Sequence, residues 1–149
     1  MLADLIRRLS GNTAEESAVG ADDARIAVAG ILVAAARADH HYDASEKDQI
    51  ERALALRYAL SPLETVKLRE QGEAAEAAAT DFYRFTSVIK QSVPHEERAS
   101  VLEALWRIVL ADRKREKHEE AMMRRVTDLL GLDDRDSVHA RQRVEASLT

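Results

Sequence analysis

The sequence contains no cysteine, two prolines, five glycines and few aromatic residues among its 149 positions. Because cysteine is absent, disulfide bonds, thiolate zinc sites and cysteine nucleophiles are excluded together. Hydrophobic residues make up 46% and charged residues 33% of the chain, a balance typical of helical globular proteins and not of disordered or all-β chains. The length fits a single domain with a sizeable core.

A basic excess and long apolar segments are also missing. The net charge is −5 at pH 7, so we expect no binding to nucleic acid, whose phosphates attract basic domains. The longest apolar run covers residues 26–36, far fewer than the roughly 20 residues that cross a bilayer. Asp4, Arg7 and Arg8 interrupt the apolar positions near the N-terminus, so no signal peptide is predicted. We therefore predict a protein that is neither exported nor membrane-spanning.

Apolar residues recur at helical spacing at the start of the chain. Leu2, Leu5 and Leu9 belong to one apolar stripe, and the polar stretch 11–20 follows it. We predict an N-terminal helix and a flexible connector over residues 1–20, ahead of a helical domain over residues 21–149.

Two later segments, residues 23–39 and 94–112, are apolar on nearly all sides, as in helices surrounded by neighbours. The Ala/Glu-rich residues 72–80 are predicted to be a frayed helix end. Periodicity and capping residues predict further helices over residues 43–60, from Ser61 onward, over 82–92, over 116–130, and a short last helix capped by Ser137. The whole pattern predicts an all-α, single-domain bundle of about seven to eight helices.

An offset of 73 residues relates the two apolar segments and the turns that follow them. It pairs Arg25 with Arg98, Leu32 with Leu105, Asp39 with Asp112, and Glu46 with Glu119. Each copy is an apolar helix, an acidic turn and an amphipathic helix, so each alone would leave an apolar face that the other copy can cover. We therefore predict two pseudo-symmetric halves.

The first acidic turn gathers five donors within eight residues. Carboxylates come from Asp39, Asp43 and Glu46, and imidazoles from His40 and His41. Oxygen and imidazole donors suit a divalent transition metal if the turn converges them, although the spacing and missing glycine do not match an EF-hand. The alternative is structural: Asp43 and Glu46 cap the second helix, Asp39 bonds the turn, and the histidines are solvated.

Arg25 and Arg98 lie 14 residues before the acids of their own copies, about 21 Å along a helix. If the two central helices pack antiparallel, each arginine approaches the acidic turn of the other copy and forms an ion pair that sets the register. The alternative is an arginine that faces solvent at each helix start.

Both copies resemble the motif of the tellurite-resistance TerB-like family: an apolar helix, Ala-Asp-Gly, an aliphatic residue and a Glu that opens the next helix. The first copy reads Ala38-Asp39-His40-His41-Tyr42-Asp43-Ala44-Ser45-Glu46, and the second runs from Ala111 to Glu119. The resemblance covers roughly residues 23–132. It implies an all-α, cytoplasmic, bacterial and non-enzymatic protein that takes part in the response to tellurite and similar stress and binds divalent metal through acids.

Two departures from the family motif affect the predicted metal sites. His40 and Arg113 replace the motif glycine, at a position where a left-handed backbone favours glycine. Arg113, Lys114, Arg115 and Lys117 also place four positive charges around the acids of the second turn. A metal site is therefore predicted only in the first turn, and the fold is not expected to require the ion.

Motifs of catalysis are lacking, since the sequence has no phosphate-cradling glycine loop, no nucleophile elbow and no HExxH spacing.

Trp106, Met122 and Met123 are predicted core residues, with a partner groove as the alternative for the methionines. The basic run 113–117 is predicted to be a solvated face or a dock for an acidic partner. We expect a non-catalytic interaction or scaffold module with a protein partner, and the oligomeric state stays open. The alternative is a small metal-dependent enzyme that uses the His/carboxylate turn.

Overall fold

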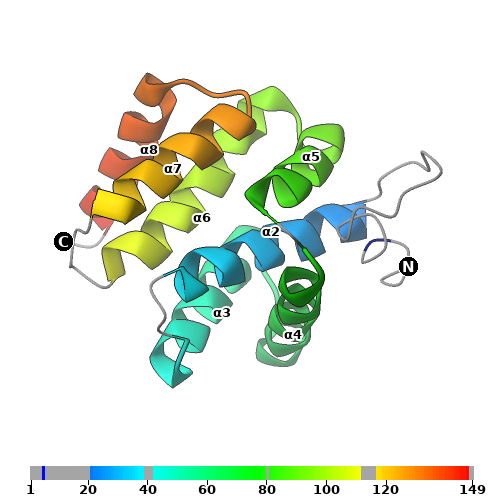
Figure 1. Cartoon of the computed structure of the whole chain (residues 1–149). Coiled ribbons are helices and arrows are strands. Elements are labelled where there is room, and N and C mark those ends of the chain that lie inside the picture. Colours follow the sequence, from blue (N-terminus) through cyan, green and yellow to red (C-terminus); the bar gives the residue numbers. More distant parts are fainter. Residues whose placement is uncertain (1–4, 6–20, 39–41, 80, 112–116, 148–149) are drawn as a thin grey trace.

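A computed structural model describes residue 5 and residues 21–38, 42–79, 81–111 and 117–147. These residues form seven α-helices, one short 3-10 turn and no strand (Figure 1). The elements are α2 (Ala21–Arg37), α3 (Ala44–Tyr58), α4 (Pro62–Ala78), α5 (Phe82–Ser92), the 3-10 turn (His95–Glu97), α6 (Arg98–Ala111), α7 (Lys117–Leu129) and α8 (Asp134–Ser147). The predicted all-α bundle is confirmed. No helix in the described part of the chain is long and apolar enough to cross a membrane.

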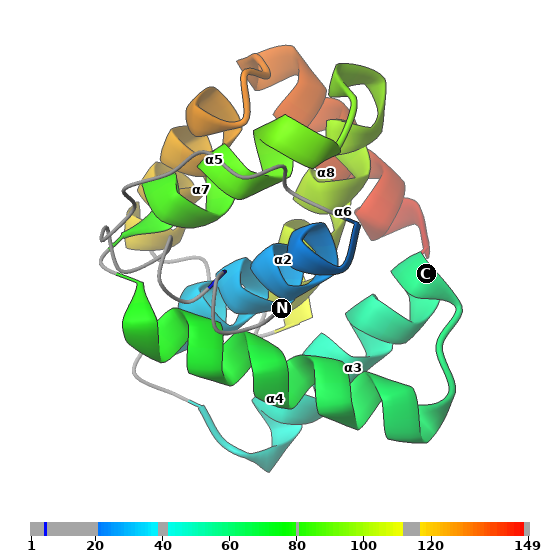
Figure 2. The ribbon, with the colours of Figure 1, turned by 90° about the vertical axis from the view of Figure 1, so that its right-hand side faces the viewer.

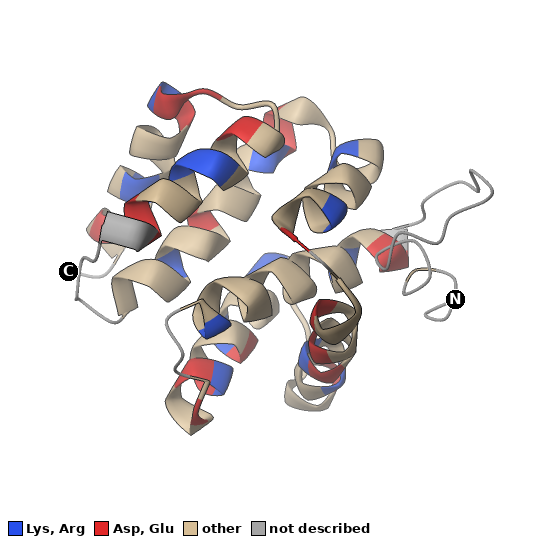
Figure 3. Ribbon diagram, viewed as in Figure 1, with Lys and Arg blue, Asp and Glu red and all other residues tan. Residues whose placement is uncertain are grey.

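Helices α2 and α6 form the centre of the bundle, as their apolar sequences predict. Helix α2 contacts α3, α4, α5 and α6, and α6 in turn contacts α3, α7 and α8. Ile31, Leu32 and Leu105 are fully buried, and Ile108 is 7% exposed. Charged residues of both signs lie along the outer helices, whereas most of α2 carries none (Figure 3). The core is therefore built around the two predicted central helices.

Leu5 is the one residue of the predicted N-terminal helix and connector that the structure describes. It lies in the hydrophobic core and is 1% exposed. The remainder of residues 1–20 lies outside the described residues, so their predicted helix and flexible connector stay predictions.

Helix α4 crosses α2 at close range (Figure 2). Gly72 permits this approach, because a Cβ atom added there would lie 2.6 Å from the Cβ of Ala29. Ala75, one turn later, is fully buried. The frayed end predicted for residues 72–80 is therefore wrong: α4 continues to Ala78, since its small residues make the contact surface and alanine favours helix.

Helix α8 packs on α6 through larger side chains. The indole Nε1 of Trp106 donates to the Ser137 hydroxyl at 3.2 Å, and the guanidinium of Arg141 lies 5.1 Å from the centre of the indole ring. The prediction that Ser137 caps α8 is wrong, because Ser137 lies inside the helix and is buried. The start of α8 is instead held by Asp133 and Asp136, each of which accepts a hydrogen bond from the backbone amide of the other.

The two arginines related by the repeat both lie against the end of the next helix. The guanidinium of Arg25 lies 4.8 Å from the ring centre of Tyr58, at the end of α3. Arg98 donates to the carbonyl of Leu130 after α7, and also to those of Lys90 and Val93 at the end of α5. The described partners of Arg98 are thus carbonyls at two helix ends. The ion pairs predicted for Arg98 with Asp39 and for Arg25 with Asp112 stay predictions, because both acids lie outside the described residues.

Candidate functional site

Two of the five predicted metal ligands lie in the described chain, at the start of α3. Asp43 is the N-cap of this helix, and its Oδ1 accepts a hydrogen bond from the Glu46 amide at 3.1 Å. Asp39, His40 and His41 lie outside the described residues. The capping role of Asp43 is confirmed, whereas the metal role of the five residues stays a prediction.

Capping leaves the Asp43 carboxylate able to bind a cation. Its side chain is exposed, and its Oδ2 has no hydrogen-bond partner among the described residues. Glu46 follows one turn later and is half-buried. A carboxylate that accepts one amide proton can still ligate a metal ion through its second oxygen, and hydrogen-bonded carboxylates are common metal ligands. The described part of the predicted donor set therefore consists of two carboxylates, of which Asp43 keeps one oxygen exposed.

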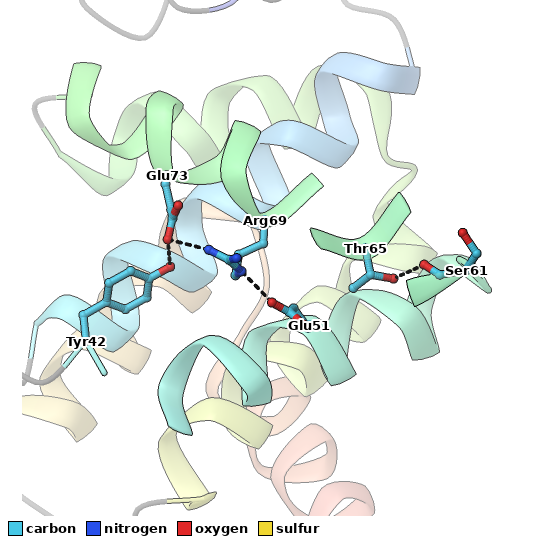
Figure 4. A network of polar contacts seen from close by, with 6 residues as sticks. All are labelled: Tyr42, Glu51, Ser61, Thr65, Arg69 and Glu73. Carbon is cyan, nitrogen blue, oxygen red and sulfur yellow. Dashed lines mark hydrogen bonds and ion pairs between the residues drawn. The ribbon is translucent and has the colours of Figure 1, made fainter. Parts of the chain in front are cut away.

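Tyr42, directly before Asp43, joins a network of polar side chains that the sequence alone did not reveal. Its hydroxyl donates to Oε2 of Glu73 on α4 at 2.5 Å, and Nη1 of Arg69 donates to the same oxygen at 2.8 Å. Nε of Arg69 in turn donates to Oε2 of Glu51 on α3 at 2.7 Å (Figure 4). The network therefore joins Tyr42, which lies within the turn, to both α3 and α4.

The protonation states of this network follow from its surroundings. Burial raises the pKa of the Tyr42 hydroxyl well above its usual value, and the nearby Glu73 carboxylate raises it further. Burial favours the neutral form of Glu73, but the hydrogen bond from Tyr42 and the positive charge of Arg69 outweigh it and hold the Glu73 pKa below its usual range. At neutral pH the hydroxyl is therefore the donor and the carboxylate the acceptor.

Positive charges also surround the first turn. The Arg37 guanidinium lies 4.7 Å from the ring centre of Tyr42, and its Nε lies 3.6 Å from Oε1 of Glu76. The Lys47 ammonium lies 5.4 Å from the same ring centre. The sequence comparison of the two turns counted cations only around the second, although Arg37 and Lys47 flank the first turn in the sequence. Both turns thus have cations beside them, and the two at the first turn contact an aromatic ring.

A cleft of about 290 Å³ opens beside this turn, where α2 and α4 end and α5 begins. It is lined by Ala34, Arg37, Ala38, Glu76, Ala79, Asp81, Phe82 and Phe85. Asp81 is the N-cap of α5, and Phe85 is a core residue, so most of this lining belongs to the structural framework of the bundle.

The second turn is described only at its end, since residues 112–116 lie outside the described residues. Glu119, in the first turn of α7, is 4% exposed, whereas its counterpart Glu46 is half-buried, and both have interaction partners. Met122 and Met123 are buried in the core, as predicted. The described acids of the two turns thus differ in their access to solvent.

Across the described ranges, no group of three or more histidine and acidic side chains lies close enough to hold a metal ion. A metal site at the first turn would therefore need Asp39, His40 or His41 in addition to Asp43 and Glu46.

The helical fold agrees with the comparison with known families. The model of the family described as tellurite resistance protein TerB matches residues 25–142, which is well over half of the chain. The chain belongs to the TerB family. No curated protein and no solved structure matches it. In this TerB chain the match spans both copies of the repeat, from the start of α2 into α8.

Proposed function

We propose that this TerB chain is a non-catalytic module of the tellurite-resistance type that binds a divalent cation at its first acidic turn. The observation that carries the proposal is the geometry of Asp43, an exposed carboxylate that uses one oxygen to cap α3 and keeps the other available. The ion would be held by Asp43 and Glu46 together with Asp39, His40 and His41. It would neutralise the clustered acids and tie the end of α2 to the start of α3.

The ligand types narrow the class of ion. Carboxylate oxygens and imidazole nitrogens together suit Zn²⁺ and Ni²⁺ better than Ca²⁺, which prefers oxygen ligands alone. The backbone amides at the start of α3 carry partial positive charge and favour negative charge at this end of the helix. The ion is therefore expected to bind to a folded protein and not to drive its folding.

A scaffold role in the cytoplasm would complement the metal site. Leu56 near the end of α3 and Leu63 near the start of α4 are 66% and 82% exposed, on either side of the loop that joins these helices. Large apolar side chains exposed in this way support contact with a protein partner, since burial of apolar area is favourable. We place this contact in the response to tellurite stress.

Titration calorimetry with Zn²⁺ and Ni²⁺ tests the metal site. We expect submillimolar binding by the wild-type protein, loss of binding when Asp39→Asn is combined with His41→Ala, and unchanged binding in the matched control Asp112→Asn. Imidazole binds metal only when neutral, so the affinity should fall as the pH drops through about 6.5. Absence of heat with either ion at millimolar concentration would refute the metal role and leave these residues as caps.

A further inference from the structure

A second cleft, of about 410 Å³, lies between the amino ends of α2 and α4 and is called the amino-end cleft below. Both helices begin on this side of their crossing (Figure 2). The cleft is lined by Asp22, Asp23, Arg25, Ile26, Leu60, Glu64, Lys67, Leu68 and Gln71, all of which the structure describes. Its volume falls within the range of about 300 to 1,000 Å³ that is typical of small-molecule sites.

The lining of the amino-end cleft combines an apolar floor with a polar rim. The floor consists of Ile26 and Leu68, which are buried, and Leu60, which is half-buried. Charged side chains of both signs surround it, and two of them, Asp22 and Lys67, are exposed. Protein pockets commonly bind small molecules in this way, with apolar contacts for the body of the ligand and a few polar groups that orient it. The cleft thus suits a ligand with an apolar part and charged groups.

Arg25 is held in place in the amino-end cleft but keeps its hydrogen-bond donors. Its guanidinium lies 4.8 Å from the ring centre of Tyr58, and this cation–π contact restrains it. It has no hydrogen-bond acceptor and no ion-pair partner among the described residues. The equivalent Arg98 instead donates to three backbone carbonyls. Because a guanidinium presents its donors in a planar fork that matches a carboxylate, Arg25 is available to bind one.

Two further charges at the amino-end cleft form no ion pair within the described part of the chain. They are the ammonium of Lys67 and the carboxylate of Asp22. Glu64, in contrast, caps the start of α4, and Asp23 has an interaction partner. The uncommitted groups are thus two cations and one carboxylate, which complement a ligand that carries both a carboxylate and an ammonium group. A multiply charged anion fits less well, because three acidic side chains line the same cleft.

We propose that the amino-end cleft binds a small zwitterion with an apolar side chain, such as an apolar α-amino acid. Arg25 and Lys67 bind its carboxylate, Asp22 binds its ammonium group, and its side chain packs on the apolar floor. The amide of Gln71 supplies a further donor and acceptor. This site does not depend on the proposed metal site, because the cleft lies at the start of α2 and the first acidic turn follows its end.

Calorimetric titration with leucine tests the site. We expect submillimolar binding by the wild-type protein, and binding about tenfold weaker or worse in Asp22→Asn and in Arg25→Gln, because each removes one charged hydrogen-bond partner of the ligand. The matched control is Arg52→Gln, which removes a positive charge from α3 at a side chain that is 72% exposed and paired with Asp48. It should bind leucine as the wild type does. Thermal unfolding checks that each variant folds, and Lys67→Gln replaces Arg25→Gln if the loss of the Tyr58 contact prevents folding.

Three analogues test the chemistry of the ligand. N-acetyl-leucine lacks the ammonium charge, leucinamide lacks the carboxylate, and glycine lacks the apolar side chain. Each should bind at least about tenfold more weakly than leucine, since each loses one of the three groups that the cleft recognises. Inorganic phosphate is the probe for a plain anion site and should bind more weakly than leucine.

Three results would overturn the proposal. The first is the absence of heat with leucine at millimolar concentration, and the second is leucine binding that is unchanged in Asp22→Asn and in the folded Arg25 or Lys67 variant. The third is tighter binding of phosphate than of leucine, which would identify a plain anion site. None of these results bears on the metal site, which lies at the other end of α2 and is tested with Zn²⁺ and Ni²⁺.

Discussion

The two halves of the molecule bring their first and third helices together in opposite ways. In the first half, α2 and α4 meet at Gly72 and Ala29, and a single added methyl group would collide with the facing helix. In the second half, α6 and α8 are separated by Trp106, whose indole is bonded to Ser137 and covered by Arg141. Small side chains thus fill the crossing of α2 and α4, whereas large side chains fill the equivalent crossing of α6 and α8.

This difference shows what a duplicated fold has to preserve. Protein interiors are close-packed, so a change of side-chain volume on one helix requires a complementary change on its neighbour. Offsets of 72 and 73 residues preserve the capped starts of α4 and α8 and the buried leucines of α2 and α6, whereas the volumes at the helix crossings have diverged. The halves should therefore respond alike to core truncation and differently to changes at the crossings.

The largest effect is expected from Leu32→Ala and Leu105→Ala, which truncate equivalent, fully buried side chains. Each should lower the free energy of unfolding by about 2 to 5 kcal/mol, because it removes apolar contacts and leaves a cavity. Denaturant melts measure the loss, with Val138→Ala, at a half-exposed position, as the control. A loss below about 1 kcal/mol in one variant alone would show that its helix is peripheral.

The crossing of α2 and α4 should be the more sensitive to added volume. Gly72→Ala is expected to lower the free energy of unfolding by about 1 to 3 kcal/mol, because the new methyl group overlaps Ala29. Alanine would otherwise stabilise the helix relative to glycine by about 1 kcal/mol, so a gain in stability would show that the helices separate without cost. Ala74→Ser, at an exposed position of α4, is the control in the same denaturant melts.

The capped start of α4 should contribute less than the core. Ser61 and Glu64 form a capping box, in which each side chain accepts a hydrogen bond from the backbone amide of the other. Ser61→Ala is expected to cost about 1 kcal/mol, since it leaves the Glu64 amide without its acceptor. Chemical denaturation measures the change in the free energy of unfolding. Ser61→Thr is the matched control, because its hydroxyl can still accept the amide hydrogen bond, and it should be as stable as the wild type. An unchanged midpoint in Ser61→Ala would mean that water replaces the cap.

The smallest effect is expected on the stability of the protein at acidic pH. Hydrogen bonds from the backbone amides of Ser61 and Asp136 hold the pKa values of Glu64 and Asp133, respectively, below their usual ranges. A carboxyl whose pKa is lower in the folded state adds stability above its unfolded pKa, about 4 for these groups, and loses it as the pH falls through the folded value. Glu64→Gln and Asp133→Asn should each flatten the decline of stability in acid. Parallel pH profiles for variant and wild type would contradict this.

Much of the fold follows from the sequence. An apolar surface on all sides of α2 and α6 identifies central helices, and the Ser61-Pro62-x-Glu64 pattern fixes the start of α4. Such features depend on neighbours within a few residues, where helix geometry alone decides which side chains meet. The continuation of α4 through its Ala/Glu-rich end did not follow, because only the close approach of α2 gives those small residues a role.

The candidate site is less accessible to prediction. Asp43 and Glu46 are recognisable by their capping spacing, and the Arg69 and Glu73 pair could have been found from its four-residue spacing. The bond between Tyr42 and Glu73 joins positions 31 residues apart, and no local pattern indicates it. The partners of Arg98 could not be predicted from the sequence either, since they are backbone carbonyls that two helix ends bring together.

The central claim is that the two turns share a sequence pattern and that, as we propose, only the first binds a divalent cation. Titration of the isotope-labelled protein with paramagnetic Ni²⁺, followed by NMR, tests it most directly, because the ion broadens the signals of amides close to it. We predict that the amides of Asp43 and Glu46 and their neighbours broaden first, while those of residues 112–120 persist. Equal or earlier broadening at residues 112–120 would contradict the account.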